Sequence, residues 1–303
     1  MKHKEGQYAA SDFTKQQLPS TRKALFWDVF RLHFFAFLRL GVLLWAFSLP
    51  LIVIGIVRDV SYIQANEQGT SNFLTLVLCD ALTPIGILSL AFWASGVSVI
   101  YREYVWLEPV FFGTDFKDGI KKNLGPTLLS TLWASVFVVI FYLCRDYFFS
   151  IEGERNGFYI AIPFGFLCFA VMPVLYHTVF LNFLYTNPYH KNLKLGMYLY
   201  GKHIPSTLLF LLLLFASRLF DWFHFVNVSM LFLKYLVITV LVIFVLPFVL
   251  LAAELHEMSI FDKHINRTRF PQLVDKGLSI GALAEKPSSK NENKNAKKRI
   301  TGK

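Results

Sequence analysis

Six apolar segments, each long enough to cross a lipid bilayer, occupy most of the chain between Phe34 and Ala253. A helical crossing takes about 20 apolar residues, and the segments must be helical because hydrocarbon offers the backbone no hydrogen-bonding partner. They are apolar on nearly every face, whereas helices of a soluble bundle carry a polar stripe that faces water. The sequence therefore predicts an all-α fold, a polytopic six-helix transmembrane bundle with a membrane domain over residues 34–253. The predicted spans lie near residues 34–57, 81–101, 127–144, 158–185, 206–224 and 230–253.

The composition supports a membrane location. Hydrophobic residues make up 55% of the 303 residues, which is too apolar for an ordinary soluble α/β protein. The segment 1–33 is polar and charged, and no short apolar run with a small-residue cleavage site precedes the first span. We therefore expect residues 1–33 to form a cytoplasmic N-terminal segment with an interfacial helix, and the first span to remain as an anchor.

Basic residues near the membrane fall almost entirely on one side of the predicted bundle. Fourteen lysines and arginines flank the spans on that side, against three on the other. Because cytoplasmic loops are enriched in Lys and Arg, the count predicts a bacterial plasma membrane protein with both termini in the cytoplasm. An even number of spans also requires the two ends to share a side. The residues counted are Lys15, Arg22, Lys23, Arg31, Arg102, Lys117, Lys121, Lys122, Lys191, Lys194, Lys202, Lys263, Arg267 and Arg269, against Arg58, Arg145 and Arg155.

Several cytoplasmic segments have the pattern of amphipathic helices on the inner face of the membrane. Residues 114–124 place apolar side chains four apart and end at a Gly-Pro pair, and residues 189–201 follow the same plan. Phenylalanines at helical spacing around Phe30 indicate another such helix before the first span. Residues 254–282 form a predicted juxtamembrane amphipathic segment.

The tail over residues 283–303 is basic and has almost nothing to bury, so we expect it to be disordered. Its positive charge favours anionic lipids, with about 1 kcal/mol for each basic residue near the membrane surface. Nucleic acid is the other common partner of such a run, but a tethered tail without aromatic residues favours the lipid bilayer. We therefore expect no nucleic acid partner.

Three polar side chains inside the predicted spans are candidates for a polar pocket: His177, Asn182 and Arg39. Pro173 should kink the helix just before His177 and Asn182 and free a backbone carbonyl there. The alternative is that His177 and Asn182 each form an interhelical hydrogen bond, worth about 1 kcal/mol. Arg39 and Lys234 lie close enough to the span ends to extend their charges to lipid headgroups.

Two features near the predicted outer side leave alternatives open. Arg218 and Asp221 are three residues apart and can pair on one helix face, with His224 one turn further. Contact with an external ligand is the other interpretation of these residues. Cys79 and Cys144 fall near outer span ends, where they either form a disulfide or serve as small buried apolar groups.

The sequence lacks the standard enzyme signatures. A Gly-x-x-x-x-Gly-Lys phosphate loop, a Gly-x-Ser-x-Gly elbow and a His-Glu-x-x-His motif are all missing. Glu254, His256, Glu257 and His264 cluster after the last span, but their spacing fits a solvated helix face better than a metal site. We expect no enzyme activity, and no catalytic, cofactor-binding or metal-binding residue.

The run LLWAFSLPLIVIG over residues 43–55 resembles the first-span signature of the YesL-like family of bacterial integral membrane proteins. Residues 115–124 are similar to the family's basic surface helix after the second span. Residues 201–209 resemble its entry to the fifth span, and residues 260–263 the segment that closes its last span. The resemblance implies a six-helix bundle in the plasma membrane, often encoded beside oligosaccharide uptake and degradation systems. It implies no functional residues.

The family context and the missing catalytic signatures favour an accessory or regulatory protein of a carbohydrate (oligosaccharide) uptake system. Its partners would be sugar ABC transporter subunits that dock on the inner-surface helices and the basic tail. The alternative is a small-solute transporter or channel in its own right, suggested by the proline-broken spans around His177 and Asn182. An intramembrane enzyme would need two carboxylates, or a histidine and a carboxylate, facing each other at matching depth, and the predicted spans do not supply them.

Overall fold

The computed structural model describes residues 18–68, 73–150, 156–214 and 228–278. Over these residues the chain is almost entirely helical and contains no strand, as the sequence predicts. Six helical stretches are long and apolar enough to cross a membrane, which confirms a multi-pass membrane protein. The elements are α1 (Arg22–Gln68), α2 (Phe73–Trp106), α3 (Phe112–Ser150), α4 (Asn156–Leu184), α5 (Tyr189–Leu214), α7 (Val228–Val240), η2 (Leu241–Val245), α8 (Leu246–Phe261), η3 (Asp262–Asn266), α9 (Arg267–Arg269) and η4 (Pro271–Leu273).

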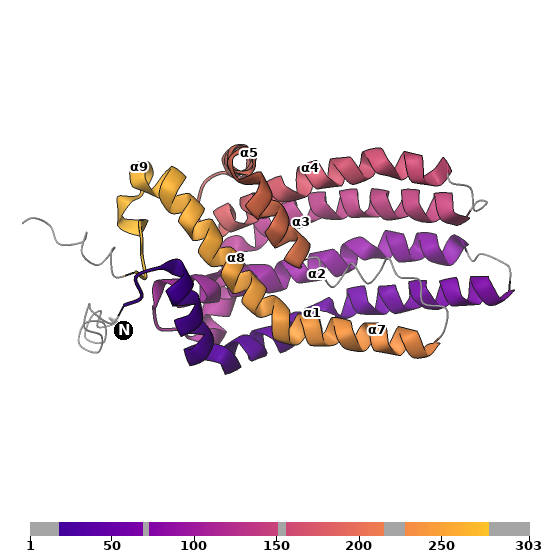
Figure 1. Ribbon diagram of the computed structural model, residues 1–303, viewed down its shortest axis with the longest axis horizontal. Coiled ribbons are helices and arrows are strands. Elements are labelled where there is room, and N and C mark those ends of the chain that lie inside the picture. Colours follow the sequence, from indigo (N-terminus) through magenta and orange to yellow (C-terminus); the bar gives the residue numbers. More distant parts are fainter. Residues whose placement is uncertain (1–17, 69–72, 151–155, 215–227, 279–303) are drawn as a thin grey trace, which may run out of the picture.

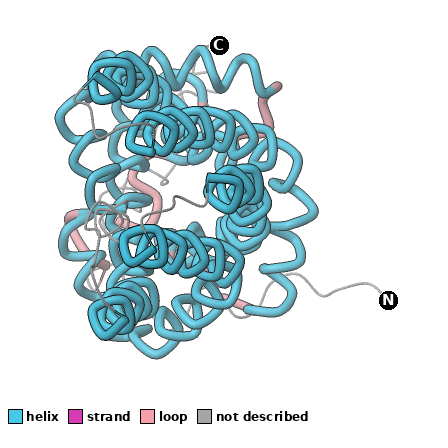
Figure 2. Tube along the Cα trace, turned by 90° about the vertical axis from the view of Figure 1, so that its right-hand side faces the viewer, coloured by secondary structure: helices cyan, strands magenta, loops and turns pink. Residues whose placement is uncertain are grey.

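Helices α1 to α4 and α7 run side by side along the longest axis of the molecule, whereas α5 and α8 cross them obliquely (Figure 1); the helices group around a common centre in the end-on view (Figure 2). Each of α1 to α5 packs on its neighbour in the sequence, and α8 returns to contact α1. We call the end that carries the start of α1, the α2–α3 connection and α9 the basic end; it lies on the left of Figure 1. The other end, where α1 ends and α2 begins, is the opposite end.

The helix α1 begins at Arg22, well before the predicted first span, and bends at His33, whose backbone dihedrals (φ −120°, ψ 20°) leave the helical region. The rings of Phe30, Phe34 and Phe37 lie 4.7, 5.6 and 5.4 Å from the ring of Phe248 on α8. The phenylalanine row that predicts an interfacial helix therefore forms a protein contact between α1 and α8.

Small residues bring α2 and α3 into close contact. A Cβ atom added at Gly119 would lie 2.5 Å from the carbonyl oxygen of Ser95 and 2.6 Å from that of Gly96. The Asn123 side chain donates a hydrogen bond of 2.7 Å to the Ser98 hydroxyl of α2.

This contact also explains why one sequence-based helix end is wrong. A Gly-Pro pair was expected to end the helix over residues 114–124, whereas α3 continues through Pro126 to Ser150. Packing against α2 overrides the local signal, because tertiary contacts outweigh the small propensity cost of a few residues.

The last long helix changes its pitch before Pro247. Proline has no N–H group, so the carbonyl of Ile243 loses its usual helical partner. The turn η2 accommodates this by a wider hydrogen bond, in which the N–H of Leu246 binds the carbonyl of Leu241. Gly41 of α1 packs against the Ile243 carbonyl so closely that any Cβ atom there would collide with it. Only glycine allows this approach.

Buried side chains concentrate in the half of the bundle at the basic end, over residues 93–105, 175–185 and 251–266. In the other half, apolar side chains such as Val53, Leu82 and Phe232 face outward. Outward apolar side chains are expected where lipid replaces water around the helices. The residues after the last predicted span are thus packed inside the protein.

Two ion pairs lie toward the opposite end. Arg58 pairs with the fully buried Asp80 of α2. Lys234 of α7 is 2% exposed, and its Nζ atom is 2.7 Å from the carboxylate of Asp59. The expectation that Lys234 extends its charge to lipid headgroups is therefore wrong, because a carboxylate on the neighbouring helix provides a closer partner than the membrane surface.

Candidate functional site

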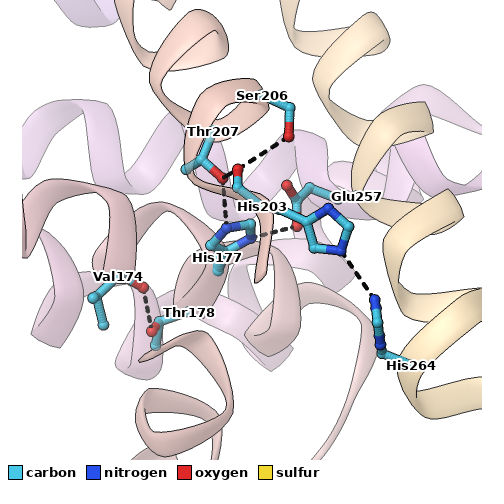
Figure 3. A network of polar contacts seen from close by, with 8 residues as sticks. All are labelled: Val174, His177, Thr178, His203, Ser206, Thr207, Glu257 and His264. Atoms are coloured by element: carbon cyan, nitrogen blue, oxygen red, sulfur yellow. Dashed lines mark hydrogen bonds and ion pairs between the residues drawn. The ribbon is translucent and has the colours of Figure 1, made fainter. Parts of the chain in front are cut away.

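A buried polar cluster, built by three helices, is centred on His177 (Figure 3). His177 lies on α4 with no exposed surface. Its Nδ1 atom is 2.8 Å from Glu257 Oε2 on α8, and its Nε2 atom is 2.9 Å from the Thr207 hydroxyl on α5. Glu257 and Thr207 are 1% and 0% exposed. We call His177, Thr207 and Glu257 the His177 cluster.

The hydrogen bonds of the His177 cluster determine how its protons are shared. The Thr207 hydroxyl donates to the carbonyl of His203 at 2.8 Å, so the Thr207 oxygen accepts from the Nε2–H group of His177. His177 Nδ1 and Glu257 Oε2 then share one proton. Wherever that proton resides, the pair is neutral as a whole, which lowers the free-energy cost of its burial.

The local sequence explains how Thr207 reaches His177. Pro205 cannot donate a backbone hydrogen bond, and its ring crowds the carbonyl of Gly201 in the preceding turn. The helix α5 bends beside it, at His203, whose dihedrals are φ −130° and ψ 32°. Ser206 and Thr207 follow Pro205 directly, and their hydroxyl groups donate hydrogen bonds back to the His203 carbonyl.

The bend of α5 is also in contact with the helix that follows α8. His203 Nε2 lies 3.0 Å from His264 Nε2 on η3. One ring must donate and the other accept, so at least one of the two imidazoles is neutral in this arrangement. Within the described part of the chain, no group of three or more His, Cys, Asp or Glu side chains could hold a metal ion.

Glu254 precedes Glu257 by one helical turn and is buried, with 5% of its surface exposed. Among the described residues it forms neither a hydrogen bond nor an ion pair. The charge of Arg102 on α2 acts on Glu254 through space, without a direct contact. The Tyr176 hydroxyl is buried close to the Glu257 carboxyl group.

Glu254 and Tyr176 line one cavity of about 240 Å³. Residues of α2, α3, α4, α5 and α8 surround this cavity, and its surface is almost entirely apolar. Trp93, Phe180 and Leu250 are among the lining side chains. Glu254 is the charged member of the lining, so the cavity combines a hydrophobic interior with one buried carboxyl group.

The structure places the three predicted pocket residues in different surroundings. His177 belongs to the His177 cluster, whereas the side-chain Oδ1 atom of Asn182 accepts a hydrogen bond of 2.7 Å from the side-chain amide of Asn192 on α5. Arg39 is exposed on α1 and belongs to neither arrangement. Each of His177 and Asn182 therefore forms an interhelical hydrogen bond, and α4 continues as a helix through Pro173.

The sequence-based view of the glutamates was wrong. Glu254 and Glu257 were expected on a solvated helix face, but α1, α2, α4 and α5 surround α8 and bury both. The structure also brings a histidine and a carboxylate face to face, which the predicted spans did not supply. A signal was present: apolar residues cover the other faces of the segment around Glu254, including Leu251, Leu255 and Met258.

At the basic end, Asp262 joins the C-terminal segment to the start of α1. Its carboxylate accepts from Arg22 at 2.8 Å and from Asn266 at 2.8 Å. Asn266 in turn accepts a hydrogen bond from the Tyr185 hydroxyl. Arg22 also donates to the carbonyl of Lys276 at 2.9 Å. These contacts hold residues 262–278 against the bundle.

Comparison of the chain with protein family models, with curated proteins and with solved structures gives no match. Function is therefore inferred from the chain's own residues. The predicted pair of Arg218 and Asp221, with His224, and the basic tail over residues 283–303 lie outside the described residues. The side chain of Cys144 is also outside them, while Cys79 is buried.

Proposed function

We propose that the chain is an accessory or regulatory protein of a bacterial carbohydrate uptake system, in the plasma membrane, with both termini in the cytoplasm. It acts through contacts with sugar ABC transporter subunits and catalyses no reaction. The resemblance of residues 43–55 to the YesL-like family supports membership of that family. The proposal rests on two observations. The cavity is lined almost entirely by apolar side chains, and three pairs of ionisable side chains in the spans bind one another.

Three pairs of ionisable side chains in the bundle are engaged with one another. Arg58 pairs with Asp80, Lys234 with Asp59, and Glu257 with His177. A sugar needs hydrogen bonds to most of its hydroxyl groups, and leaving them unpaired in an apolar site costs about 1–3 kcal/mol each. The lining of the cavity is almost entirely apolar, which disfavours sugar binding there. We therefore propose that the chain contributes to sugar uptake by contacting a transporter rather than by binding the sugar itself.

The distribution of exposed charge supports the orientation and the docking face. Exposed basic residues gather at the basic end, on the start of α3, on the start of α5 and on α9. This is the side that the positive-inside rule assigns to the cytoplasm. Lys117 and Lys121 on α3, and Lys191 and Lys194 on α5, extend into solvent there and form the proposed docking face. The basic tail holds the same side of the protein against anionic lipids.

A copurification experiment tests the docking role. The tagged full chain, purified in mild detergent from its native membrane, should bring down subunits of a sugar ABC transporter. The variant Lys191→Glu with Lys194→Glu should lose them, while the charge-preserving variant Lys191→Arg with Lys194→Arg should retain them. Deletion of the gene should lower oligosaccharide uptake. Unchanged uptake, together with no transporter subunit in the wild-type preparation, would exclude the proposal.

A second candidate function is that of a small-solute transporter in its own right. Glu254 and the His177 cluster favour it, because ionisable groups inside a membrane protein commonly mark substrate or proton pathways. Solute flux into proteoliposomes should then depend on the cluster and be lost in His177→Ala. A folded His177→Ala protein that supports the same flux as the wild type would exclude this function.

A further inference from the structure

A buried carboxyl group without a partner requires an explanation. Glu254 is 5% exposed and forms no hydrogen bond or ion pair among the described residues, whereas one carboxylate oxygen of its neighbour Glu257 is paired with His177. An isolated carboxylate in an apolar interior is strongly disfavoured. The carboxyl group of Glu254 lines the cavity, so a molecule in that cavity can provide the missing partner.

We propose that the cavity beside Glu254 binds a hydrophobic amine, a small ammonium compound with one aryl or short alkyl body whose charge pairs with Glu254. The site is independent of the docking face at the basic end. Tyr176 also lines the cavity, and its hydroxyl group lies close to Glu257. The remaining contacts are hydrophobic.

The chemistry of the lining selects this ligand class over the alternatives. A sugar would leave most of its hydroxyl groups without partners among Leu250, Val97 and the other apolar side chains. An anion would face Glu254, with Glu257 one turn further along the same helix. Trp93 and Phe180 also line the cavity, and the face of an aromatic ring attracts a cation rather than an anion.

The volume limits the size of the amine. The cavity of about 240 Å³ lies below the usual range of drug-sized pockets, which is roughly 300–1,000 Å³. A single ring with a short aminoalkyl chain therefore fits, with the ring among the apolar residues and the ammonium group at Glu254. A long lipid chain is the competing occupant, and the experiment separates the two.

The test is equilibrium binding of radiolabelled 2-phenylethylamine to the full chain in lipid nanodiscs. We expect saturable binding that n-propylbenzene, the neutral compound of the same shape, competes for poorly. Glu254→Gln should weaken binding by roughly 30-fold or more, because it removes the charge from a buried ion pair. Ala134→Phe, which fills the cavity and leaves Glu254 intact, should abolish binding. Glu108→Gln, the same change at an exposed carboxylate, should leave it unchanged.

Four results would overturn the proposal. Binding of 2-phenylethylamine that does not saturate is the first. Equal competition by n-propylbenzene, which would show that the carboxyl group has no role, is the second. The third is unaltered binding in both Glu254→Gln and Ala134→Phe. The fourth is a copurified lipid in the cavity that 2-phenylethylamine does not displace. None of these results affects copurification with a transporter, so failure of the amine site and failure of the docking role are distinguishable.

Discussion

His177 on α4 and Glu257 on α8 face each other at 2.8 Å although they are 80 positions apart in the chain. Both side chains are buried, and Thr207 of α5 completes the contact. The His177 cluster therefore joins three of the helices that line the cavity. Because His177 and Glu257 share one proton, the contact adds no net charge to the interior.

We predict that breaking the His177 and Glu257 pair destabilises the protein strongly. Glu257→Ala or His177→Ala should lower the free energy of unfolding by about 3–5 kcal/mol, since the remaining polar group stays buried without its partner. The measurement is reversible unfolding in mixed detergent micelles. The double variant His177→Leu with Glu257→Leu should recover much of the loss.

Lys263→Ala, a change at an exposed residue on the same final helix, provides the control and should alter stability by less than about 0.5 kcal/mol. Additive losses in the double variant would contradict a coupled pair.

A second prediction concerns the contact between Gly41 and the Ile243 carbonyl. Gly41→Ala should lower the free energy of unfolding by about 1–3 kcal/mol, because a Cβ atom would collide with the backbone at the turn before Pro247. Gly125→Ala is the matched control: its Cβ atom would meet nothing within 4 Å in α3, so the change should be neutral or stabilise by up to about 1 kcal/mol. Equal effects at the two positions would argue against the close contact.

A third prediction tests whether Lys234 is held in a buried ion pair or extends to lipid headgroups. Lys234→Met should destabilise the protein, because it leaves Asp59 without its ammonium partner at 2.7 Å. Adding Asp59→Asn to Lys234→Met should restore part of the lost melting temperature. Lys191→Met, at an exposed lysine, should have little effect. A melting temperature that Lys234→Met leaves unchanged would support a headgroup contact instead.

A fourth prediction tests the orientation in the membrane. In a background with the three native cysteines replaced, Gln64→Cys should react with a membrane-impermeant maleimide on intact cells, because Gln64 is exposed at the opposite end. Lys117→Cys, at the basic end, should react only after the cells are opened. The reverse pattern would place the basic end outside the cell.

Local pattern was sufficient to predict six long apolar helices. The pattern was insufficient for the ends of the helices, as Pro126 shows, because a proline stops a helix only when no neighbouring helix stabilises its continuation.

The candidate site was only partly predictable. His177 and Asn182 stood out because polar side chains are rare in membrane spans. Glu254 and Glu257 did not, since glutamates just after a span are as compatible with water as with a protein interior. Arg39 looked similar to His177 in the sequence, yet it lies exposed on α1.

The amino-acid sequence by itself determined that this chain is a helical, multi-pass membrane protein, because hydrophobicity and span length are properties of contiguous residues. Only the tertiary structure decided which polar groups are buried and with which partners. His177 meets Glu257, Lys234 meets Asp59, and Glu254 faces a cavity through the packing of helices that are distant in the chain. A contact of this kind depends on the order and rotation of helices in the bundle, which no local pattern encodes.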